Sequence, residues 1–352
     1  MRAALYYGRE DLRLEDVAEP ETGPGDVKLR VLYAGICGSD LHEYYAGPVF
    51  TRADEPHPFS GVTNPVIIGH ELCGEVVEVG PGVEGISEGE LIAVEPVETC
   101  GQCEACLTGR RCTQYAIHGY TRTSGAFSEY TMIKERMAHK VPTRLGARTG
   151  ALVEPMSVGM IAAKRAGLAA EQTAVLHGAG PIGIGVLLAL RAWGVDVVVS
   201  DPSERRREAV RSLGVTHVLD PIDTDVVGAV KELTDGAGAA ASIDAAGVPA
   251  ALDAAIRSTA PDGRVVLVAV PLKPLEIDVG RFHQSRVFLT ASTGTSPTPD
   301  AFREVIELMA AGHYPADGWT ETIAFDDVVE EGFEALHRQE KVKVLIDVAG
   351  TA

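Results

Sequence analysis

Expected strands and helices alternate along the chain from Thr173 onward, and this pattern constrains the fold more than any other feature. The expected strands cover residues 173–177, 196–200, 216–219, 241–244, 264–270 and 287–292. The expected helices between them lie near 182–193, 204–213, 226–233 and 250–258. Such alternation predicts a parallel sheet with helices on both faces, the α/β doubly wound architecture.

A glycine-rich turn lies between the first expected strand and the first expected helix. Gly178, Gly180 and Gly183 fit G-x-G-x-x-G, a pattern that gains meaning only in this strand–turn–helix setting. Gly178 would form the tight turn, Gly180 would admit a pyrophosphate, and Gly183 would let helix and strand pack closely. Pro181 and Ile182 begin the helix, whose N-terminal N–H groups attract phosphate. The segment predicts a Rossmann dinucleotide site.

Asp201 ends the second expected strand and bears on which dinucleotide is bound. A carboxylate there accepts hydrogen bonds from the adenosine ribose and would repel a 2′-phosphate, so NAD is favoured over NADP. Residues 205–207 are three arginines that could instead meet a phosphate. An ordinary structural role is also open, in which Asp201 starts a turn with Pro202 and caps the next helix.

Four cysteines fall within thirteen residues. They are Cys100, Cys103, Cys106 and Cys112. In a chain of 352 residues whose N-terminus lacks a signal-peptide pattern, such density favours metal over disulfides. Four thiolates close a tetrahedral shell and predict a structural zinc ion. Redox sensing and four unrelated free thiols are the alternatives.

A second set of side chains offers ligands to a catalytic metal. Cys37 provides a sulfur, His70 a ring nitrogen, and Glu71 and Glu154 carboxylates. A catalytic zinc needs about three protein ligands and an open position. Taken singly, each residue also has an ordinary structural interpretation, and local spacing alone does not bring the four together.

The order of motifs along the chain resembles that of the zinc-containing medium-chain dehydrogenases. The matching segments, from Cys37-Gly38-Ser39-Asp40 through Gly69-His70-Glu71, the cysteine cluster and Glu154-Pro155 to the glycine turn, run the length of the sequence. The resemblance implies a β-rich, GroES-like catalytic domain at 1–153, to which 296–352 return, and a Rossmann NAD-binding domain at 154–295.

The resemblance also implies roles for single residues. Cys37 and His70 would ligate the catalytic zinc, and Glu71 and Glu154 would complete its shell, in exchange with water. Ser39 would hydrogen-bond the substrate hydroxyl. His42 would pass the proton onward through the cofactor ribose to solvent, and Arg206 would contact the adenosine ribose.

One departure from the family pattern concerns the cysteine cluster. Family members usually have seven residues between the third and fourth cysteines, whereas five separate Cys106 from Cys112 here. A tetrahedral site can still close around a tighter loop, because the metal constrains the sulfurs more than the connecting chain. The second zinc therefore remains the expectation.

Substrate class rests on resemblance to one group of the family. Segments at 41–44, 47–50, 56–58 and 330–336 are similar to the 2,3-butanediol dehydrogenases, which implies a secondary alcohol, a vicinal diol, and its acetoin-type ketone. Residues 282–295 are unlike that group and leave polyol, threonine and aminocyclitol dehydrogenases open. A non-catalytic NAD- or zinc-binding protein is disfavoured, because the reactive side chains are all present.

Composition limits the partners. A formal net charge of −19 disfavours nucleic acid and anionic membranes. No apolar run is long enough to span a bilayer, and a cytoplasmic protein is expected. Family resemblance suggests a homo-oligomer, a dimer or tetramer.

Overall fold

The computed structural model describes residues 1–108, 110, 112–271, 273–294 and 300–350. Contacts between residues divide the chain into two compact units. Unit 1 comprises Met1–Glu154, Phe302–Ala310 and Thr320–Ala352, and unit 2 comprises Pro155–Ala301 and Ala311–Trp319. Residues 295–299, which contain the expected domain boundary at 295/296, lie outside the described residues.

Unit 2 contains a six-stranded sheet in which every pair of neighbouring strands is parallel. Its order is β13-β12-β11-β14-β15-β16. The strands are β11 (Thr173–His177), β12 (Asp196–Ser200), β13 (Val218–Leu219), β14 (Ala239–Asp244), β15 (Thr259–Leu267) and β16 (Phe288–Ala291). This sheet confirms the doubly wound α/β class. Several expected bounds were wrong by a few residues: β13 begins at Val218 rather than 216, and β15 begins at Thr259 rather than 264. Strand β15 also ends before 268–270, because the N–H groups of Val268 and Ala269 bond Asp244 O.

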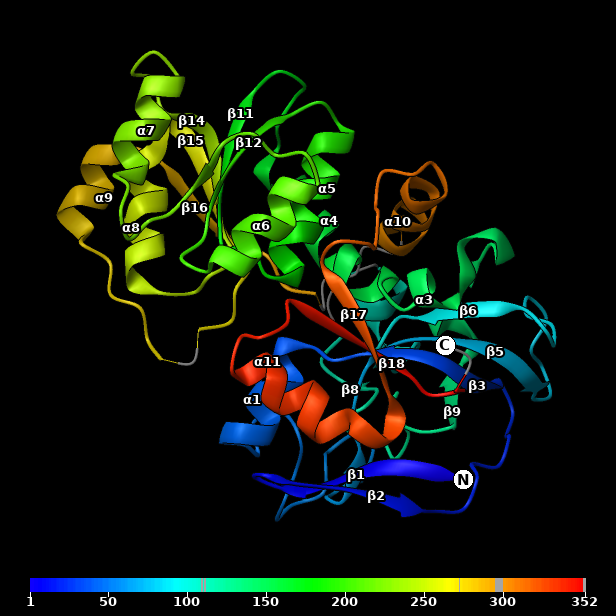
Figure 1. Ribbon diagram of the computed structural model, residues 1–352. Coiled ribbons are helices and arrows are strands. Elements are labelled where there is room, and N and C mark those ends of the chain that lie inside the picture. The colour runs from blue at the N-terminus through cyan, green and yellow to red at the C-terminus, as the bar shows by residue number, and fades with distance from the viewer. Residues whose placement is uncertain (109, 111, 272, 295–299, 351–352) are drawn as a thin grey trace. The chain divides into compact units, whose positions relative to one another are not determined.

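Helices cover both faces of this sheet (Figure 1). They are α4 (Val153–Ala166), α5 (Pro181–Ala192), α6 (Glu204–Ser212), α7 (Val226–Leu233), α8 (Pro249–Ser258) and α9 (Val279–Ser285). Buried valines of β11, β12 and α7 form one apolar cluster. Helices α5 and α8 begin with proline at the first turn, where the missing N–H costs no helical hydrogen bond.

Unit 1 is built from antiparallel sheets and one long mixed sheet. The largest runs β10-β6-β5-β3-β18-β17, with β9 also paired to β3; a second is β2-β1-β4, and β7 and β8 form a hairpin. The bounds are β1 (Arg2–Gly8), β2 (Asp11–Asp16), β3 (Asp26–Gly35), β4 (Val66–Ile67), β5 (Glu71–Val79), β6 (Leu91–Val94), β7 (Val97–Thr99), β8 (Tyr115–Ile117), β9 (Tyr130–Lys134), β10 (Ala138–Val141), β17 (Thr320–Ala324) and β18 (Lys343–Asp347). Because β18 pairs with β3, the end of the chain returns to the sheet of unit 1.

The helices of unit 1 are short, and the first two residues of α10 are assigned to unit 2. They are α1 (Gly38–Ala46), α2 (Glu104–Leu107), η1 (Glu135–Met137), η2 (Thr143–Leu145), α3 (Gly146–Gly150), α10 (Asp300–Ala310), η3 (Phe325–Asp327), η4 (Val328–Glu334) and α11 (Ala335–His337). Helix α1 includes the first four residues of the polar, proline-rich stretch 43–65. Every helix in the described part of the chain is too short or too polar to cross a bilayer.

Candidate active site

Strand register brings Cys37, His70 and Glu71 together. Strands β3 and β5 are antiparallel neighbours with Gly35 opposite Glu71. Cys37 follows β3 as the N-cap of α1, and His70 directly precedes β5. A β-carbon at Gly35 would lie 2.0 Å from Glu71 Oε2, so only glycine leaves room for that carboxylate. Residues 34 positions apart along the chain thus meet at one end of the sheet.

The ligand atoms of Cys37, His70 and Glu71 all lie within 4.8 Å of one another. His70 and Glu71 are buried, and Cys37 is partly exposed. One sulfur, one nitrogen and one carboxylate within this distance fit a zinc ion that keeps a position open for substrate. Among the described residues, no hydrogen-bond partner satisfies the buried Nδ1 of His70. The donor set therefore fits a catalytic zinc ion.

The carboxylate of Asp40 lies close to both Cys37 and His70. Its Oδ2 accepts the Cys37 N–H at 2.8 Å, and its Oδ1 lies 3.5 Å from His70 Nδ1, longer than a hydrogen bond. Burial disfavours the charged imidazole, but Asp40 and then Cys37 outweigh it and raise the pKa of His70 well above its usual value. A fully buried carboxylate beside a ligating histidine is the arrangement that orients such ligands.

Lys343 holds Glu71 from the opposite side. Its buried ammonium pairs with Glu71 Oε2 and donates to Ile36 O at 2.9 Å. Both side chains are about 1 % exposed, so each charge depends on the other for compensation. The pair engages one oxygen of the Glu71 carboxylate and leaves the other available to a metal.

Glu154 lies at the start of α4, outside the group of three mutually close ligand atoms. It is 8 % exposed, and burial, then the charges of Glu71 and Asp40, raise its pKa to about 7 against the opposing effects of His70 and Lys343. These charge interactions locate Glu154 beside the cluster. Its direct ligation of the metal remains a proposal.

Tyr120 joins the cluster to α1. Its phenol lies 2.8 Å from Ser39 Oγ and 2.7 Å from Asp40 Oδ1. Its ring centroid is 5.1 Å from that of His70 and 5.1 Å from that of Phe50, on which it stacks. Burial, and then the charge of Asp40, raise the pKa of this phenol well above 10, so it keeps its proton at neutral pH.

His42 is the other expected proton-handling residue. It lies three residues after Ser39 on α1, so both side chains share one side of the helix. Burial lowers its pKa below the usual 6.5. The imidazole is therefore neutral at pH 7 and able to accept a proton.

The four-cysteine cluster forms a compact set of sulfurs. Neighbouring Sγ atoms are 3.5 to 3.8 Å apart. Zinc–sulfur bonds of about 2.3 Å place the sulfurs of a tetrahedral site about 3.8 Å apart. A disulfide needs about 2.05 Å, and all four thiols are free. The five-residue spacing between Cys106 and Cys112 is thus compatible with a closed zinc site.

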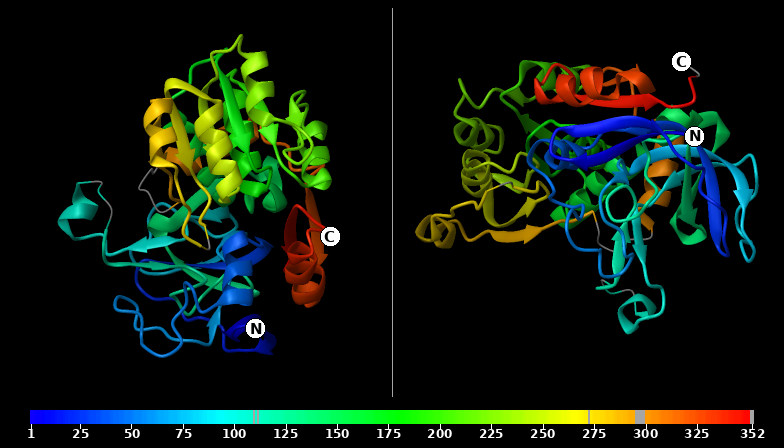
Figure 2. Two further views of the ribbon diagram at one scale, coloured as in Figure 1. Left: turned by 90° about the vertical axis from the view of Figure 1, so that its left-hand side faces the viewer. Right: turned by 90° about the horizontal axis from the view of Figure 1, so that it is seen from below.

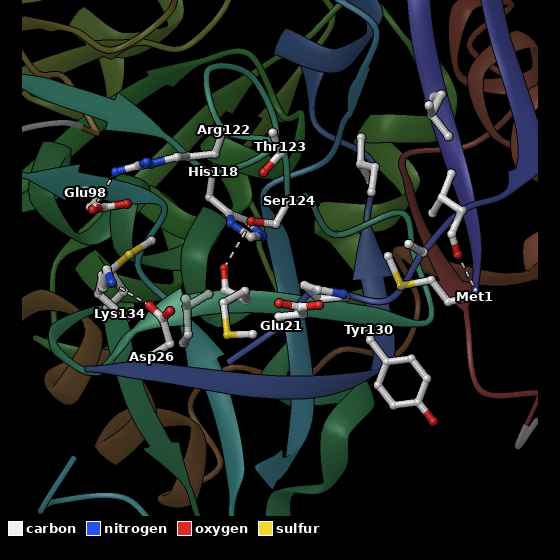
Figure 3. A pocket seen from close by; sticks show the side chains of 18 of the residues that line it. Met1, Glu21, Asp26, Glu98, His118, Arg122, Thr123, Ser124, Tyr130 and Lys134 are labelled. Atoms are coloured by element: carbon white, nitrogen blue, oxygen red, sulfur yellow. Dashed lines mark hydrogen bonds and ion pairs between the residues drawn. The ribbon is translucent and has the colours of Figure 1, made fainter. Parts of the chain in front are cut away.

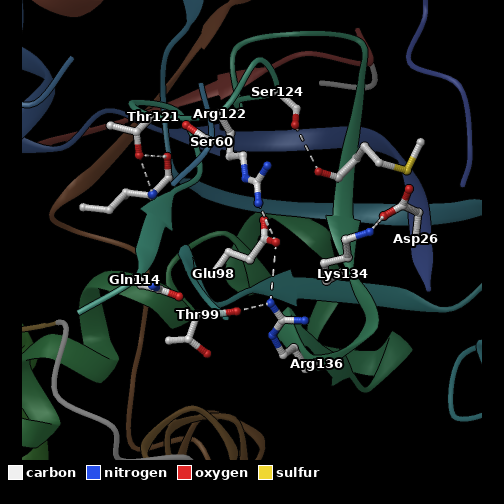
Figure 4. Close-up of polar contacts among 12 residues, drawn as sticks. Asp26, Ser60, Glu98, Thr99, Gln114, Thr121, Arg122, Ser124, Lys134 and Arg136 are labelled. Carbon is white, nitrogen blue, oxygen red and sulfur yellow. Dashed lines mark hydrogen bonds and ion pairs between the residues drawn. The ribbon is translucent and has the colours of Figure 1, made fainter. Parts of the chain in front are cut away.

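This cysteine lobe, residues 100–112, projects from unit 1 (Figure 2). It extends from the hairpin of β7 and β8, and paired charges hold the base of that hairpin (Figure 4). Glu98 of β7 lies 2.6 Å from Arg122 and 3.5 Å from Arg136, and Arg136 also bonds Thr99 O. The base is fixed by unit 1, and the tip carries the short helix α2.

The three motif glycines of unit 2 have different surroundings. Gly178 has φ +98°, and a β-carbon there would lie 2.9 Å from Ala245 C. A β-carbon at Gly183 would lie 2.0 Å from Gly178 O. At Gly180 it would meet open space, with only Arg206 as far as 4.0 Å away. Protein packing explains two of the glycines, and the open space at Gly180 fits the approach of a pyrophosphate at the α5 N-terminus formed by Pro181 and Ile182.

Asp201 links β12 to the glycine turn. Its Oδ2 accepts the Ala179 N–H at 2.7 Å and its Oδ1 accepts the Ser203 N–H at 2.8 Å. Arg206 lies 3.7 Å from the same carboxylate. Arg207 is buried and pairs with Asp220 and Glu204, so it is committed within the protein and is poorly placed to meet a 2′-phosphate.

A cavity of about 600 Å³ lies elsewhere in unit 1 (Figure 3). Four charged side chains of its walls form two ion pairs: Arg122 with Glu98, and Lys134 with Asp26 at 2.5 Å. His118 is buried there beside Thr131, and burial lowers its pKa to about 3. Glu21 and the Met1 ammonium also line the cavity, and neither is in an ion pair with another described residue.

Sequence reasoning assigned no role to Asp40, Tyr120 or Lys343. Asp40 lies within the Cys37-Gly38-Ser39-Asp40 motif, and Lys343 carries a signal, because a lysine that begins a buried strand needs a buried partner. Tyr120 has no comparable local signal, since it lies 81 residues from Ser39 and 80 from Asp40 in the sequence.

Two domain families match the chain. The Alcohol dehydrogenase GroES-like domain matches residues 23–143, and the Zinc-binding dehydrogenase family matches residues 181–311. With the cysteine cluster and the Cys37–His70–Glu71 group, these matches define a zinc-dependent oxidoreductase. The chain belongs to the zinc-containing medium-chain alcohol dehydrogenase family.

Three proteins illustrate the similarity. (R,R)-butanediol dehydrogenase of Bacillus subtilis is 39 % identical over 98 % of this chain and 99 % of its own length. A crystal structure of 2R,3R-butanediol dehydrogenase from Bacillus subtilis superposes with a TM-score of 0.91 at 38 % identity, covering 99 % of each chain. Sorbitol dehydrogenase of Bacillus subtilis is 33 % identical over 77 % of this chain and 75 % of its own.

Proposed function

We propose that this chain is an NAD-linked dehydrogenase that interconverts a secondary alcohol, a vicinal diol such as 2,3-butanediol, and its acetoin-type ketone. The observation that carries this proposal is the 39 % identity to a butanediol dehydrogenase over nearly the whole chain. Unit 1 would be the catalytic domain and unit 2 the NAD-binding domain. The Cys37–His70–Glu71 group supplies the chemistry that such a reaction needs.

Cys37, His70 and Glu71 would hold the catalytic zinc ion, with Glu154 beside them. When bound, zinc acts as a Lewis acid that lowers the pKa of an alcohol oxygen, and hydride leaves carbon readily only as that oxygen loses its proton. Ser39 would accept the hydrogen bond of the substrate hydroxyl. His42, neutral and on the same side of α1, would carry the proton toward solvent.

Unit 2 would bind NAD through the glycine turn and Asp201. The open space at Gly180 and the N-terminus of α5 suit a pyrophosphate. The Asp201 carboxylate already accepts two backbone N–H groups and still has lone pairs for ribose hydroxyls. Arg206 would contact the adenosine ribose. Arg207 pairs with Asp220 and Glu204. The three arginines at 205–207 would therefore bind a 2′-phosphate less strongly than three unpaired arginines.

Asp201→Ala should weaken NAD binding by about tenfold or more and leave NADP binding less affected or improved. The variant removes the ribose acceptor and also the charge that repels a 2′-phosphate. Titration of both cofactors by nicotinamide fluorescence measures the effect. Asp196→Ala is the matched control, because it removes an exposed carboxylate from the first residue of the same strand, β12. An unchanged NAD-to-NADP ratio in Asp201→Ala would refute the assignment.

The alternative within the family is a polyol, threonine or aminocyclitol substrate. The similarity to sorbitol dehydrogenase favours a polyol as the alternative substrate. A substrate panel separates the readings: 2,3-butanediol stereoisomers, acetoin, diacetyl, sorbitol, threonine and an aminocyclitol, each followed by nicotinamide absorbance. We expect the highest kcat/KM with a vicinal diol or acetoin. A higher kcat/KM with sorbitol or threonine would replace the vicinal diol as the assigned substrate. If zinc-loaded protein turned over none of these alcohols, dehydrogenase function would be rejected.

We also propose that the chain assembles as a homo-oligomer, a dimer or tetramer. Within the described residues, β16 pairs only with β15, so one edge of the sheet in unit 2 is free. Phe288 on that edge strand is 62 % exposed, which is unusual for an aromatic side chain on a sheet edge. Pairing with a second copy would cover both the edge and the ring.

A further inference from the structure

Tyr120 occupies a position that the proposed reaction does not explain by itself. It is 3 % exposed, and its phenol oxygen is within hydrogen-bond distance of two oxygens on α1, Ser39 Oγ and Asp40 Oδ1. One of these belongs to the residue expected to receive the substrate hydroxyl. The other belongs to the carboxylate that contacts Cys37 N–H and faces His70.

The surroundings of the ring fix the phenol in place. Phe50 stacks on one side, and the His70 ring lies close by. Phe50 is itself held by its N–H, which donates to the buried carboxylate of Glu43 at 2.6 Å. Thr51 Oγ1 donates to the same carboxylate at 2.6 Å. The loop that supports Tyr120 is therefore tied to α1, the helix that carries Ser39.

A serine hydroxyl on its own samples several staggered rotamers. Cys37 is fixed by the β3 end and by its N–H bond to Asp40, but Ser39 has Tyr120 as the one side-chain partner identified among the described residues. A buried phenol 2.8 Å away favours one rotamer of Ser39. Its second contact, to Asp40, stops the phenol from following Ser39 if that side chain turns.

We propose that Tyr120 is a positioning residue, which holds the Ser39 hydroxyl in the orientation that receives the substrate hydroxyl. The inference rests on the proposed dehydrogenase function, in which Ser39 meets the substrate. Tyr120 acts through Ser39 and contacts no reacting atom. The phenol belongs to a loop that is far from α1 in the sequence. Its hydrogen bonds therefore join this loop to α1 beside Ser39, where the substrate hydroxyl would bind.

Tyr120→Phe tests this directly, because it keeps the ring contacts with His70 and Phe50 and removes only the hydroxyl. We expect kcat to fall by about tenfold to a hundredfold, because a misplaced reacting group can cost up to about a hundredfold, while zinc content and NAD affinity stay unchanged. Tyr7→Phe is the matched control, since its phenol bonds the partly exposed Glu15 at 3.2 Å and lies outside this network.

A double-mutant cycle with Ser39→Ala decides whether Tyr120 acts through Ser39. If it does, Tyr120→Phe has no further effect on kcat in the Ser39→Ala background. Equal losses of kcat in both backgrounds would overturn the proposal, as would a Tyr120→Phe variant with wild-type kcat.

A crystal structure of Tyr120→Phe gives a readout that does not depend on turnover. We expect the Ser39 side chain to adopt a second rotamer or several, with Cys37, His70 and the metal in place. An unmoved Ser39 would overturn the inference even if the enzyme were active. If the wild-type protein turned over no alcohol, the proposed function would fail, whereas the rotamer result would still report on the Tyr120–Ser39 contact.

Discussion

Replacing Cys37 with serine should reduce turnover by about a thousandfold or more, because it removes a ligand of the catalytic zinc. A serine hydroxyl stays protonated at neutral pH and is a poor substitute for a thiolate. Loss of the metal withdraws several kcal/mol of transition-state stabilisation, which corresponds to a rate change of this size. His70→Ala should have a similar effect, since it removes a second ligand from the same site.

Metal analysis distinguishes this loss from unfolding. Wild-type protein should contain two zinc ions per chain, and both variants should contain one, held by the cysteine lobe. NAD binding, measured by titration, should persist, because the glycine turn and Asp201 belong to unit 2. Cys73→Ala serves as the control: this cysteine is buried in β5, outside the ligand cluster, and should leave both ions in place. Two bound ions with full turnover in Cys37→Ser would reject the assignment.

The doubly wound sheet could be predicted because its signals are local. Each buried strand of unit 2 is a short apolar run, and the glycine turn falls between β11 and α5, where the pattern alone suffices. The predicted strand bounds were wrong where tertiary contacts decide them. Strand β15 ends early, because the N–H groups of the two residues after it bond Asp244 O. Helix α1 was missed as an element because its apolar face is short and its N-cap is a cysteine.

The candidate site could be predicted only in part, because its geometry is not local. Cys37 and His70 meet through the register of β3 with β5, which a sequence without an alignment does not reveal. The resemblance to the family supplied that grouping. It did not supply Tyr120 or Lys343, whose roles depend on contacts across 80 and 272 residues. Side chains that orient ligands leave weaker patterns than ligands do.

Cys103→Ser should remove the second zinc ion and destabilise the lobe at 100–112. The lobe has little apolar core: Leu107 in α2 is 76 % exposed, and Cys112 is the only one of the four cysteines that is buried. Without metal, four thiols 3.5 to 3.8 Å apart offer only weak hydrogen bonds to hold the tip. Structural zinc sites contribute folding free energy directly, so the tip should unfold locally.

Zinc content, proteolysis, thermal melting and turnover check this. Zinc analysis should give one ion per chain, and trypsin should cut rapidly after Arg110, whose 64 % exposed side chain pairs with Glu104 and donates to Thr108 Oγ1 within the lobe itself. We expect the melting temperature to fall by about 5 to 10 °C if the lobe contributes to the folding of unit 1. Turnover per catalytic zinc should stay within a few fold, because the Cys37–His70–Glu71 group lies on other elements.

A redox role for the lobe predicts a different outcome, and the same variant separates the two. If the cysteines were a sensor, wild-type protein would contain one zinc ion, and mild oxidation would form a disulfide that Cys103→Ser partly blocks. A structural site instead predicts that bound zinc protects all four thiols from alkylation, and that chelation exposes them together. The shortened link between Cys106 and Cys112 makes this test informative, since a loop too tight for tetrahedral ligation would leave at least one thiol reactive in the zinc-loaded protein.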